Sequence, residues 1–382
     1  MIAAPQTQTH ALRFEILYQS KRSRARVGRI HTPHGIIDTP NFVAVGTNGS
    51  LKTLHNHQLD DLQLMFCNTY HLMVQPGTEV IKNAGGLHQF ISRQQPIITD
   101  SGGFQVFSLA YGDVAKELKG QGGKKHSGSV LKITEEGVTF RSYRDGTKIF
   151  LSPETSVAAQ KDLGADIIIP LDELLPFHVD EAKLKASFDR THRWGLRSLQ
   201  THLQRPQKQA MYAVIHGGTD LKLRQQSCEI LREHAFDGFA IGGSLGCDHA
   251  QLFQTVAATT QYIPDDKPVH LLGIGDLISI PQCIPHGIDT FDSCYPTKVA
   301  RHGMVFTQQG ALKMTRKIHE REFFPLEEHC LCATCRHYTR AYLHHLFKAN
   351  EPSAASLASV HNVHFMVQWM ASIRMEILCG LI

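Results

Sequence analysis

The stretch Asp166-Ile167-Ile168-Ile169-Pro170-Leu171-Asp172-Glu173 carries an apolar run that ends in two carboxylates. Such runs are typical of strands buried on both faces, as in a parallel sheet. Short β-rich runs recur along the chain, and a turn and a stretch compatible with a helix follow each of them. The eight runs are residues 42–47, 64–70, 96–104, 166–173, 210–218, 238–244, 269–275 and 290–296. They predict an α/β fold, a (β/α)₈ TIM barrel. An open doubly wound sheet is the alternative, but no Gly-x-Gly-x-x-Gly opens the first unit.

Two segments interrupt this repeat. Residues 111–153 alternate as two strands around a turn at Tyr143-Arg144-Asp145-Gly146, and the glycine-rich, basic stretch 119–125 precedes them. We therefore expect an inserted hairpin after the third strand. The second interruption, residues 307–362, follows the eighth strand and precedes an amphipathic tail that is expected to pack on the barrel. The predicted domains are a catalytic barrel at 14–306 and a C-terminal subdomain at 307–382.

Four potential metal ligands lie near the end of the chain in the pattern Cys-x-Cys-x-x-Cys…His, namely Cys330, Cys332, Cys335 and His361. Three thiolates and an imidazole complete a tetrahedral zinc shell, and four protein ligands leave no open position for a reacting water. We therefore predict one structural Zn²⁺ per chain in a zinc-binding subdomain, although a thiolate-rich site also suits iron or cobalt. Chance clustering is the alternative in a chain with nine cysteines and 24 histidines. The other cysteines indicate small buried side chains rather than disulfides, so a reducing, cytoplasmic setting is expected.

The composition is that of a folded chain with only a mild charge. With 382 residues, 42% of them hydrophobic and 19% charged, the chain can bury a large core. Its net charge of +4 does not by itself imply nucleic acid. Basic residues gather at Lys313, Arg316, Lys317, Arg336, His337, Arg340, His344, His345 and Lys348, either as a phosphate-binding patch or as a solvated helix face. Residues 1–10 lack the apolar core of a signal peptide and no apolar stretch could span a bilayer, so no membrane association is expected.

The ends of the predicted strands carry the polar residues, and in a TIM barrel the working side chains lie there. Carboxylates from three strands, Asp100, Asp172 and Asp292, are expected to face one mouth. Paired carboxylates can divide the labour of glycosyl transfer, one attacking a carbon while the other moves a proton. Gly-Gly pairs at 102–103, 217–218 and 242–243 either admit a flat ligand or only serve tight turns. Phe104 either stacks on a base or is an ordinary core aromatic.

Several motifs resemble one known family. They are Asn68-Thr69-Tyr70-His71-Leu72, Asp100-Ser101-Gly102-Gly103-Phe104-Gln105-Val106, Gly242-Gly243, Gly287-Ile288-Asp289-Thr290-Phe291-Asp292 with Pro296-Thr297, and the cysteine set with His361-Asn362. Together they resemble the tRNA-guanine transglycosylases, or queuine tRNA-ribosyltransferases, of bacterial type, from about residue 14 to residue 361. The family implies a zinc-binding barrel that exchanges a guanine in tRNA for a 7-deazaguanine without a nucleotide cofactor.

The resemblance also implies roles for individual residues. Asp292 would attack the ribose C1′ and hold a covalent enzyme–tRNA intermediate, and Asp100 would be the general acid and base. Substrate-binding residues would be Asp172, His216, Gly243, Phe104, Ser101 and Asn68, and tRNA-binding residues would be Lys298 and Arg301. The substrates implied are the Asp, Asn, His and Tyr tRNAs, whose anticodon loops contain U-G-U, and the base must leave the loop stack. A homodimer is expected.

The sequence departs from the usual bacterial pattern at a few positions. His216 replaces a Gln, Ser244 a Leu, Leu174 a small Cys, and Lys298 a frequent Arg, which keeps the charge but loses a bidentate fork. Bacterial members commonly have Val where this chain has Gly246. Removal of that side chain would enlarge the pocket near the 7-substituent, which leads to the hypothesis that queuine is accepted rather than, or besides, 7-aminomethyl-7-deazaguanine.

Three other classes compete with this interpretation. A barrel glycosidase would leave the zinc set unexplained and would need several tryptophans for sugar stacking, whereas the chain has only Trp194 and Trp369. A non-catalytic tRNA-binding subunit is disfavoured because Asp100, Asp172 and Asp292 are all present. An archaeal-type enzyme acting on the D-loop would be expected to carry further C-terminal RNA-binding domains.

Overall fold

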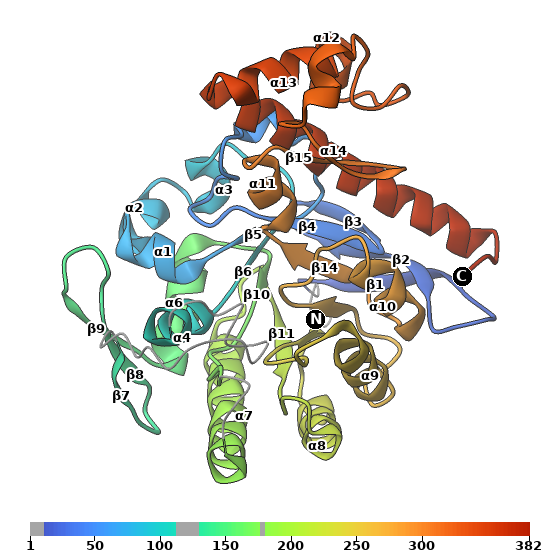
Figure 1. The fold of residues 1–382 in the computed structure, drawn as a ribbon. Coiled ribbons are helices and arrows are strands. Elements are labelled where there is room, and N and C mark those ends of the chain that lie inside the picture. The colour runs from blue at the N-terminus through green and yellow to red at the C-terminus, as the bar shows by residue number, and fades with distance from the viewer. Residues whose placement is uncertain (1–10, 112–129, 176–179) are drawn as a thin grey trace, which may run out of the picture.

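The computed structural model of the chain describes residues 11–111, 130–175 and 180–382. Eight parallel strands close into a barrel (Figure 1). In order around the barrel they are β4 (Asn41–Val45), β5 (Met65–Cys67), β6 (Ile97–Thr99), β10 (Ile167–Ile168), β11 (Ala210–Ile215), β12 (Gly238–Ile241), β13 (Val269–Leu271) and β14 (Thr290–Ser293). Each overlaps one of the predicted runs, so the (β/α)₈ TIM barrel is confirmed and the open doubly wound sheet is excluded.

The strands are shorter than the predicted runs, and β10 shows why. Ile169 pairs with a side chain instead of a strand, because its N–H donates to Gln160 Oε1 at 3.0 Å and its carbonyl accepts from Gln160 Nε2 at 2.8 Å. Pro170, the next residue, has no N–H to offer a ladder. The chain therefore leaves the barrel early and carries Asp172 into the loop beyond it.

Helices surround the barrel and connect its strands. They are α1 (Thr69–Val74), α2 (Thr78–Asn83), α3 (Leu87–Phe90), α4 (Gly103–Tyr111), α6 (Pro153–Leu163), α7 (Glu181–Gln204), α8 (Leu221–Arg232), α9 (His249–Thr260), α10 (Ser279–Cys283) and α11 (Tyr295–Ala300), with short 3₁₀ turns at Asn56–Gln58 and Ile284–His286. Asp220 and Asp248 cap α8 and α9 by accepting backbone N–H groups of the first turn.

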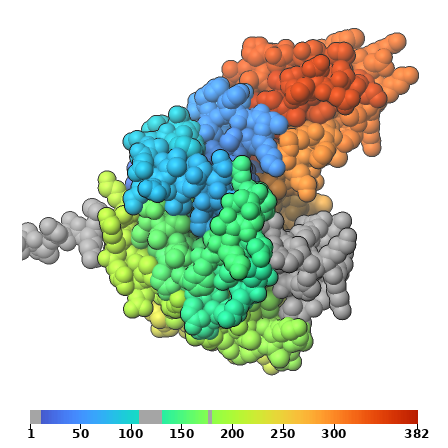
Figure 2. Space-filling view, turned by 90° about the vertical axis from the view of Figure 1, so that its left-hand side faces the viewer, coloured from blue at the N-terminus to red at the C-terminus, as the bar shows by residue number. Residues whose placement is uncertain are grey.

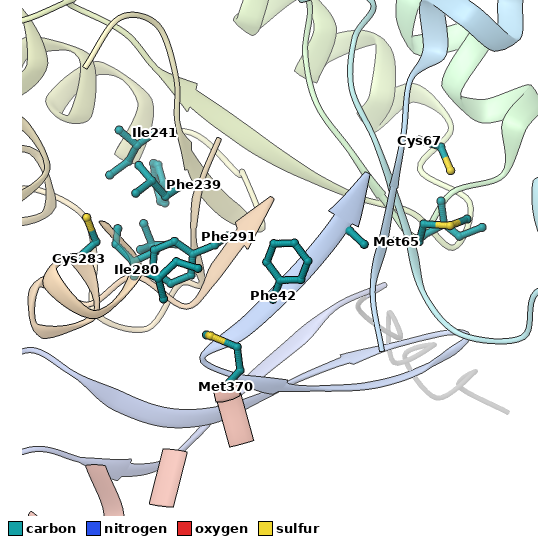
Figure 3. Packing of buried hydrophobic residues seen from close by; sticks show 14 of the residues in the cluster. Phe42, Met65, Cys67, Phe239, Ile241, Ile280, Cys283, Phe291 and Met370 are labelled. Carbon is teal, nitrogen blue, oxygen red and sulfur yellow. The ribbon is translucent and has the colours of Figure 1, made fainter. Parts of the chain in front are cut away.

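The strands are buried on both faces, as the sequence predicts. Val43, Tyr212 and Val214 belong to the cluster inside the barrel, whereas Phe42 and Phe291 belong to the cluster between the barrel and its helices. Figure 3 shows Phe42 and Phe291 in this outer layer, with Met370 of the C-terminal helix beneath Phe42. This two-sided burial explains the nearly continuous apolar runs.

An antiparallel sheet that the sequence analysis missed precedes the barrel. It comprises β1 (Arg13–Gln19), β2 (Arg26–Thr32) and β3 (Gly35–Thr39), in that order. Ile30 and Ile37 are fully buried and pack in the same cluster as the residues inside the barrel. The turn between β2 and β3 brings His34 to Asp166, which lies just before β10. The sheet therefore closes the amino end of the barrel.

The inserted element has one strand more than predicted. It is a sheet of β7 (Val130–Ile133), β8 (Val138–Arg141) and β9 (Lys148–Leu151), all antiparallel, between β6 and β10. The predicted turn at 143–146 is confirmed between β8 and β9. The prediction of two strands was wrong because residues 130–133 also pair, through Val130, Lys132 and Ile133. The glycine-rich stretch 119–125 lies outside the described residues.

The C-terminal segment stands beside the barrel (Figures 1 and 2), and its long last helix packs against the barrel. It contains β15 (Met304–Thr307), β16 (Gly310–Lys313), a 3₁₀ turn at Lys317–Arg321, α12 (Ala333–His337), α13 (Arg340–Lys348) and α14 (Pro352–Leu378). Val363, Met366 and Met370 of α14 lie in the cluster that covers the barrel. Among the described residues, no helix is long and apolar enough to cross a membrane.

Candidate active site and metal site

Three carboxylates lie at the carboxyl ends of barrel strands. Asp100 directly follows β6, Asp172 lies in the loop after β10, and Asp292 is the second-last residue of β14. All three belong to one closed barrel, so the expectation that they come to the same end is met. Their surroundings differ, and the differences decide what each can do.

Asp100 is held by neutral donors. Its Oδ2 accepts from Asn68 Nδ2 at 2.6 Å and Gln105 Nε2 at 2.8 Å, and its Oδ1 accepts from the N–H groups of Thr69 and Gly102. Burial raises the pKa of Asp100 to about 6, although these hydrogen bonds oppose the rise. A carboxyl group with this pKa can both give and take a proton near neutral pH.

Asp172 has a partner on each oxygen. His216 Nε2 lies 2.8 Å from Oδ2, and Ser101 Oγ donates to Oδ1 at 3.3 Å. Gly103 permits the approach, because a Cβ there would lie 2.7 Å from the Asp172 carbonyl oxygen. The neighbouring Glu173 is turned away and pairs with Arg190 of α7 at 2.6 Å. The structure thus brings Ser101, Asp172 and His216 together.

Asp292 is bound on one oxygen. Its Oδ1 accepts from the Gly273 N–H at 2.8 Å and lies 3.0 Å from His270 Nε2. Its Oδ2 takes no hydrogen bond from any residue that the structure describes. A carboxylate with one fixed and one free oxygen is suited to attack a carbon.

The remaining predicted residues lie around these carboxylates. Phe104, at the start of α4, is 46% exposed, which favours a stacking surface over a core aromatic. Gly243 and Ser244 follow β12 and line a cavity of about 70 Å³ beside His216. Lys298 is exposed on α11, which begins just after Asp292, and Arg301 ends that helix. Two larger hollows, of about 300 and 400 Å³, lie away from all three carboxylates.

Two residues of the site were missed by the sequence analysis. Arg224 of α8 is fully buried and donates to the carbonyls of Ile215, Gly218 and Ser244, so it holds together the loops after β11 and β12. Burial lowers its pKa to about 10, which leaves it charged at neutral pH. The other residue is His270 of β13, which sits in an apolar run and contacts Asp292.

The structure contradicts the hypothesis that Gly246 enlarges the pocket near the 7-substituent of the base. Its φ is +116°, and a Cβ on it would lie 2.4 Å from Cβ and 2.8 Å from Oε1 of Gln251. The space that a side chain would take is therefore filled by the first turn of α9. The glycine is required by this close packing and does not enlarge a base pocket.

The predicted metal ligands converge. His361 Nδ1 lies 3.7, 3.6 and 3.3 Å from the sulfur atoms of Cys330, Cys332 and Cys335. A tetrahedral zinc with bonds of about 2.3 Å to sulfur and 2.0 Å to nitrogen separates such ligands by about 3.5 Å, so the group could hold zinc. His361 Nε2 lies 2.7 Å from the Phe306 carbonyl, which fixes the ring as outer-shell partners of metal ligands do.

Two residues of the predicted basic patch form hydrogen bonds inside the C-terminal segment. Arg340 donates to Glu322 and to the Leu326 carbonyl, and the buried His344 contacts the Met314 carbonyl at 2.7 Å. These two residues are therefore not part of an open phosphate-binding surface. The other members that are exposed are Arg316, Lys317, Arg336, His337, His345 and Lys348.

The fold and the site together define a barrel enzyme suited to glycosyl transfer, with a separate Cys₃His group that could hold a metal ion. A family model described as queuine tRNA-ribosyltransferase matches residues 20–381. A protein of Protochlamydia amoebophila with that name is 62% identical over 367 residues, covering 96% of this chain and 95% of that protein. Namesakes from Chlamydia abortus and Chlamydia trachomatis serovar D are 58% and 56% identical over 369 residues, covering 96% of this chain and 99% of theirs. The chain therefore belongs to the queuine tRNA-ribosyltransferase family, and it is a pentosyltransferase.

Proposed function

We propose that this enzyme exchanges the wobble guanine of the Asp, Asn, His and Tyr tRNAs, whose anticodon loops contain U-G-U, for a 7-deazaguanine base in queuosine biosynthesis. The exchange passes through a covalent enzyme–tRNA intermediate on Asp292. The observation that carries the proposal is the contrast between Asp292, which has a free oxygen, and Asp100, whose pKa burial raises to about 6. One group is suited to attack and the other to move a proton.

The proposed reaction has two halves. In the first, Asp292 bonds to C1′ as the bond from C1′ to guanine N9 breaks, and Asp100 gives its proton to the leaving base. In the second, Asp100 takes the N9 proton of the incoming base, which then displaces the carboxylate. The ribose configuration is retained, as in double-displacement glycosidases. Charge and protons balance without a nucleotide cofactor.

Base recognition is assigned to the groups around Asp172. Its carboxylate would accept hydrogen bonds from the purine edge, with Ser101, His216 and the Gly243 backbone beside it. Phe104 would stack on the ring, and Asn68 would hold Asp100. The incoming base is 7-aminomethyl-7-deazaguanine or queuine. Steady-state comparison of the two bases measures the preference.

The tRNA is proposed to lie across the mouth of the barrel and along α11. Lys298 and Arg301 on this helix would contact phosphates close to the attacked ribose. Because tRNA is the substrate, we place the enzyme in the cytoplasm. The glycosidase alternative loses support, because Trp194 is fully buried and donates its indole N–H to the Glu135 carbonyl.

The first experiment is incubation of the protein with radiolabelled guanine and unmodified tRNA-Tyr, beside Asp292→Asn. Incorporation by the wild type and none by the variant, together with a wild-type enzyme–tRNA adduct on a denaturing gel, is the expected result. Failure of well-folded, metal-loaded wild type to incorporate guanine would overturn the proposal and favour the hydrolase or the non-catalytic subunit.

We further propose that the Cys₃His group binds one Zn²⁺ per chain and that the metal organises residues 307–382 as a structural subdomain. Four protein ligands leave no position for substrate, so the ion would act through folding. Cys332→Ser should release the metal and lower the melting temperature, measured by elemental analysis and calorimetry. Selective loss of turnover in a variant that stays fully folded would contradict the structural role.

A homodimer is proposed to form through this subdomain. Ile318, Phe323 and Leu331 are 71, 76 and 65% exposed there, and large apolar side chains in such number favour a protein interface. Phe323→Glu should convert the dimer to a monomer in light scattering. A wild type that is monomeric at micromolar concentration would exclude this assembly.

A further inference from the structure

A buried histidine that the sequence analysis missed contacts Asp292. His270 lies on β13, opposite Thr290 of β14, and its side chain has no exposed surface. Its Nε2 is 3.0 Å from Asp292 Oδ1, and its Nδ1 is 2.8 Å from Thr290 Oγ1. The ring of Phe66 stacks against it at 6.0 Å between centroids. Both ring nitrogens and one ring face are therefore fixed.

The partners determine where the proton sits on this ring. A carboxylate oxygen only accepts, so Nε2 must carry a hydrogen and donate it to Asp292. The Thr290 hydroxyl can then donate to Nδ1. A neutral imidazole with its hydrogen on Nε2 satisfies every polar atom of this chain of hydrogen bonds, and the hydrogen bond from the Thr290 hydroxyl to Nδ1 stabilises this tautomer, which the Asp292 carboxylate requires.

Two donors thus converge on one oxygen of the carboxylate. The Gly273 N–H donates to the same Oδ1 at 2.8 Å. Asp172 provides the contrast, because its contacts are spread over both oxygens, from Ser101 to Oδ1 and from His216 to Oδ2. A histidine partner on a carboxylate is therefore not the distinguishing feature. The distinguishing feature is that both donors of Asp292 leave the second oxygen open.

We propose that His270 is a positioning residue that, with the Gly273 N–H, fixes Oδ1 of Asp292 and makes Oδ2 the atom that attacks the ribose. This inference rests on the proposed function, in which Asp292 is the nucleophile. The bond from Oδ2 to C1′ forms as the bond from C1′ to guanine N9 breaks. Oδ1 then becomes the carbonyl oxygen of the glycosyl ester, still facing its two donors.

The same donors assist the second half of the reaction. When the incoming base displaces the ester, the electron pair of the bond between Oδ2 and C1′ returns to the carboxylate. The returning charge is shared with Oδ1, where His270 and Gly273 already point. Donors placed in advance where charge develops lower the barrier more than donors that must reorganise. His270 itself neither gains nor loses a proton.

The test compares His270→Leu, which removes the donor, with His270→Gln, whose side-chain amide can restore it. His270→Leu should slow adduct formation and adduct breakdown in single-turnover experiments by roughly 10²-fold to 10³-fold. Its KM for tRNA should stay within about threefold, because the donor acts on the carboxylate and not on tRNA binding. His270→Gln should recover most of both rates.

Thr290→Val provides an independent variant if His270→Leu fails to fold. It keeps the shape of the threonine but removes the hydroxyl that stabilises this tautomer and orients the ring, and it should slow both steps roughly tenfold, a smaller loss than that expected from removing the donor itself. His344→Leu is the matched control, since His344 is also buried but, among the described residues, its one hydrogen-bond partner is the Met314 carbonyl. It should lower stability without changing either rate of the folded fraction.

The outcomes separate this inference from the proposed function. Wild-type exchange that Asp292→Asn abolishes, together with normal rates in His270→Leu, would overturn the positioning role alone. Equal impairment of folded His270→Gln and His270→Leu would also overturn it, because any change of shape would then suffice. Absence of exchange in the wild type would instead refute the proposed function.

Discussion

Two aspartates three residues apart, Asp289 just before β14 and Asp292 within it, have opposite kinds of surroundings. Asp289, at the amino end, is fully buried, and both of its oxygens are occupied, by Arg26 Nε at 2.9 Å, Arg26 Nη2 at 2.6 Å and the Val269 N–H at 2.7 Å. Asp292, at the carboxyl end, accepts from donors of the described residues on Oδ1 alone. Within the part of the chain that the structure describes, the same type of side chain thus has both oxygens occupied at the amino end of this segment and one oxygen free at its carboxyl end.

The contrast extends around the barrel. At the amino end, Asp289, Asp166 and Asp237 each accept the N–H of a residue at the start of a neighbouring strand, namely Val269, Ile97 and Met211. These carboxylates fix strand positions, as expected for the stability face of a TIM barrel. Residue type therefore does not identify a carboxylate that can react with substrate. What identifies it is an oxygen atom that the surrounding protein leaves free to bind a ligand.

The largest effect is expected from Asp292→Asn. The amide is a poor nucleophile, so guanine exchange should fall by at least about 10³-fold. Stability should change little, because the amide oxygen can still accept from Gly273 and His270. Radiolabel incorporation and urea unfolding of the same preparation measure both quantities. A marked loss of stability would show that Asp292 resembles Asp289 and would break the comparison.

The reciprocal substitution, Asp289→Asn, should act on stability. It leaves the Arg26 guanidinium buried without its charged partner, and breaking a buried pair in this way costs about 3–5 kcal/mol. Urea unfolding measures the loss. Exchange per folded molecule should be unchanged at 25 °C, and a selective fall in turnover would contradict the division between the two ends.

The pH dependence of the chemical step should also separate the two ends. Burial raises the pKa of Asp100 to about 6, so its protonated, proton-donating form is lost as pH rises through 6. The rate of adduct formation should then fall up to about tenfold per pH unit above that value. At the amino end, burial would raise the pKa of Asp166, but the hydrogen bond from His34 and the nearby ring of His88 lower it, so Asp166 stays ionised throughout this range. A flat single-turnover profile from pH 5 to 8 would contradict the role of Asp100.

The sequence was sufficient to predict the barrel strands and the three carboxylates at their ends. The eight barrel strands were found because both faces are buried, and Asp100, Asp172 and Asp292 because they close apolar runs. The sheet β1–β3 was missed because β1 is partly exposed along its whole length and shows no clean alternation. The four potential metal ligands could be predicted from their spacing alone, because three of them lie within six residues.

The rest depends on contacts between distant segments. His270 lies in the run Val269-His270-Leu271 and reads as an ordinary strand residue until β13 pairs with β14. Arg224 lies on a helix, where an arginine suggests solvent, yet it donates to three carbonyls, one at the end of β11 and two in the loops after β11 and β12. The direction of a side chain at Gly246 could not be inferred from sequence. One signal for His270 was available in the sequence. It is a polar residue inside an apolar run, and the next predicted strand along the chain contains Asp292.

The smallest effect is expected from His34→Gln at the amino end. The hydrogen bond to Asp166 raises the pKa of His34, although burial and the charge of Lys208 oppose the rise, and its ring stacks on His88 at 3.6 Å. A raised pKa stabilises the fold fully below the unfolded value near 6.5, and this contribution is lost as pH rises through the folded value. Because the side chain is 40% exposed, screening limits the contribution to about 1 kcal/mol or less.

Urea unfolding of wild type and His34→Gln at pH 5.5 and 8.5 checks this sign. The wild type should be more stable at pH 5.5, and the difference should shrink toward zero at pH 8.5. Guanine exchange should be the same in both proteins, because His34 and Asp166 lie at the end of the barrel away from Asp292. A stability difference that grows with pH would show that the imidazole acts there as a neutral packing group. Altered exchange would show that the amino end also influences the chemistry, and the saturated carboxylates could then no longer be treated as purely structural.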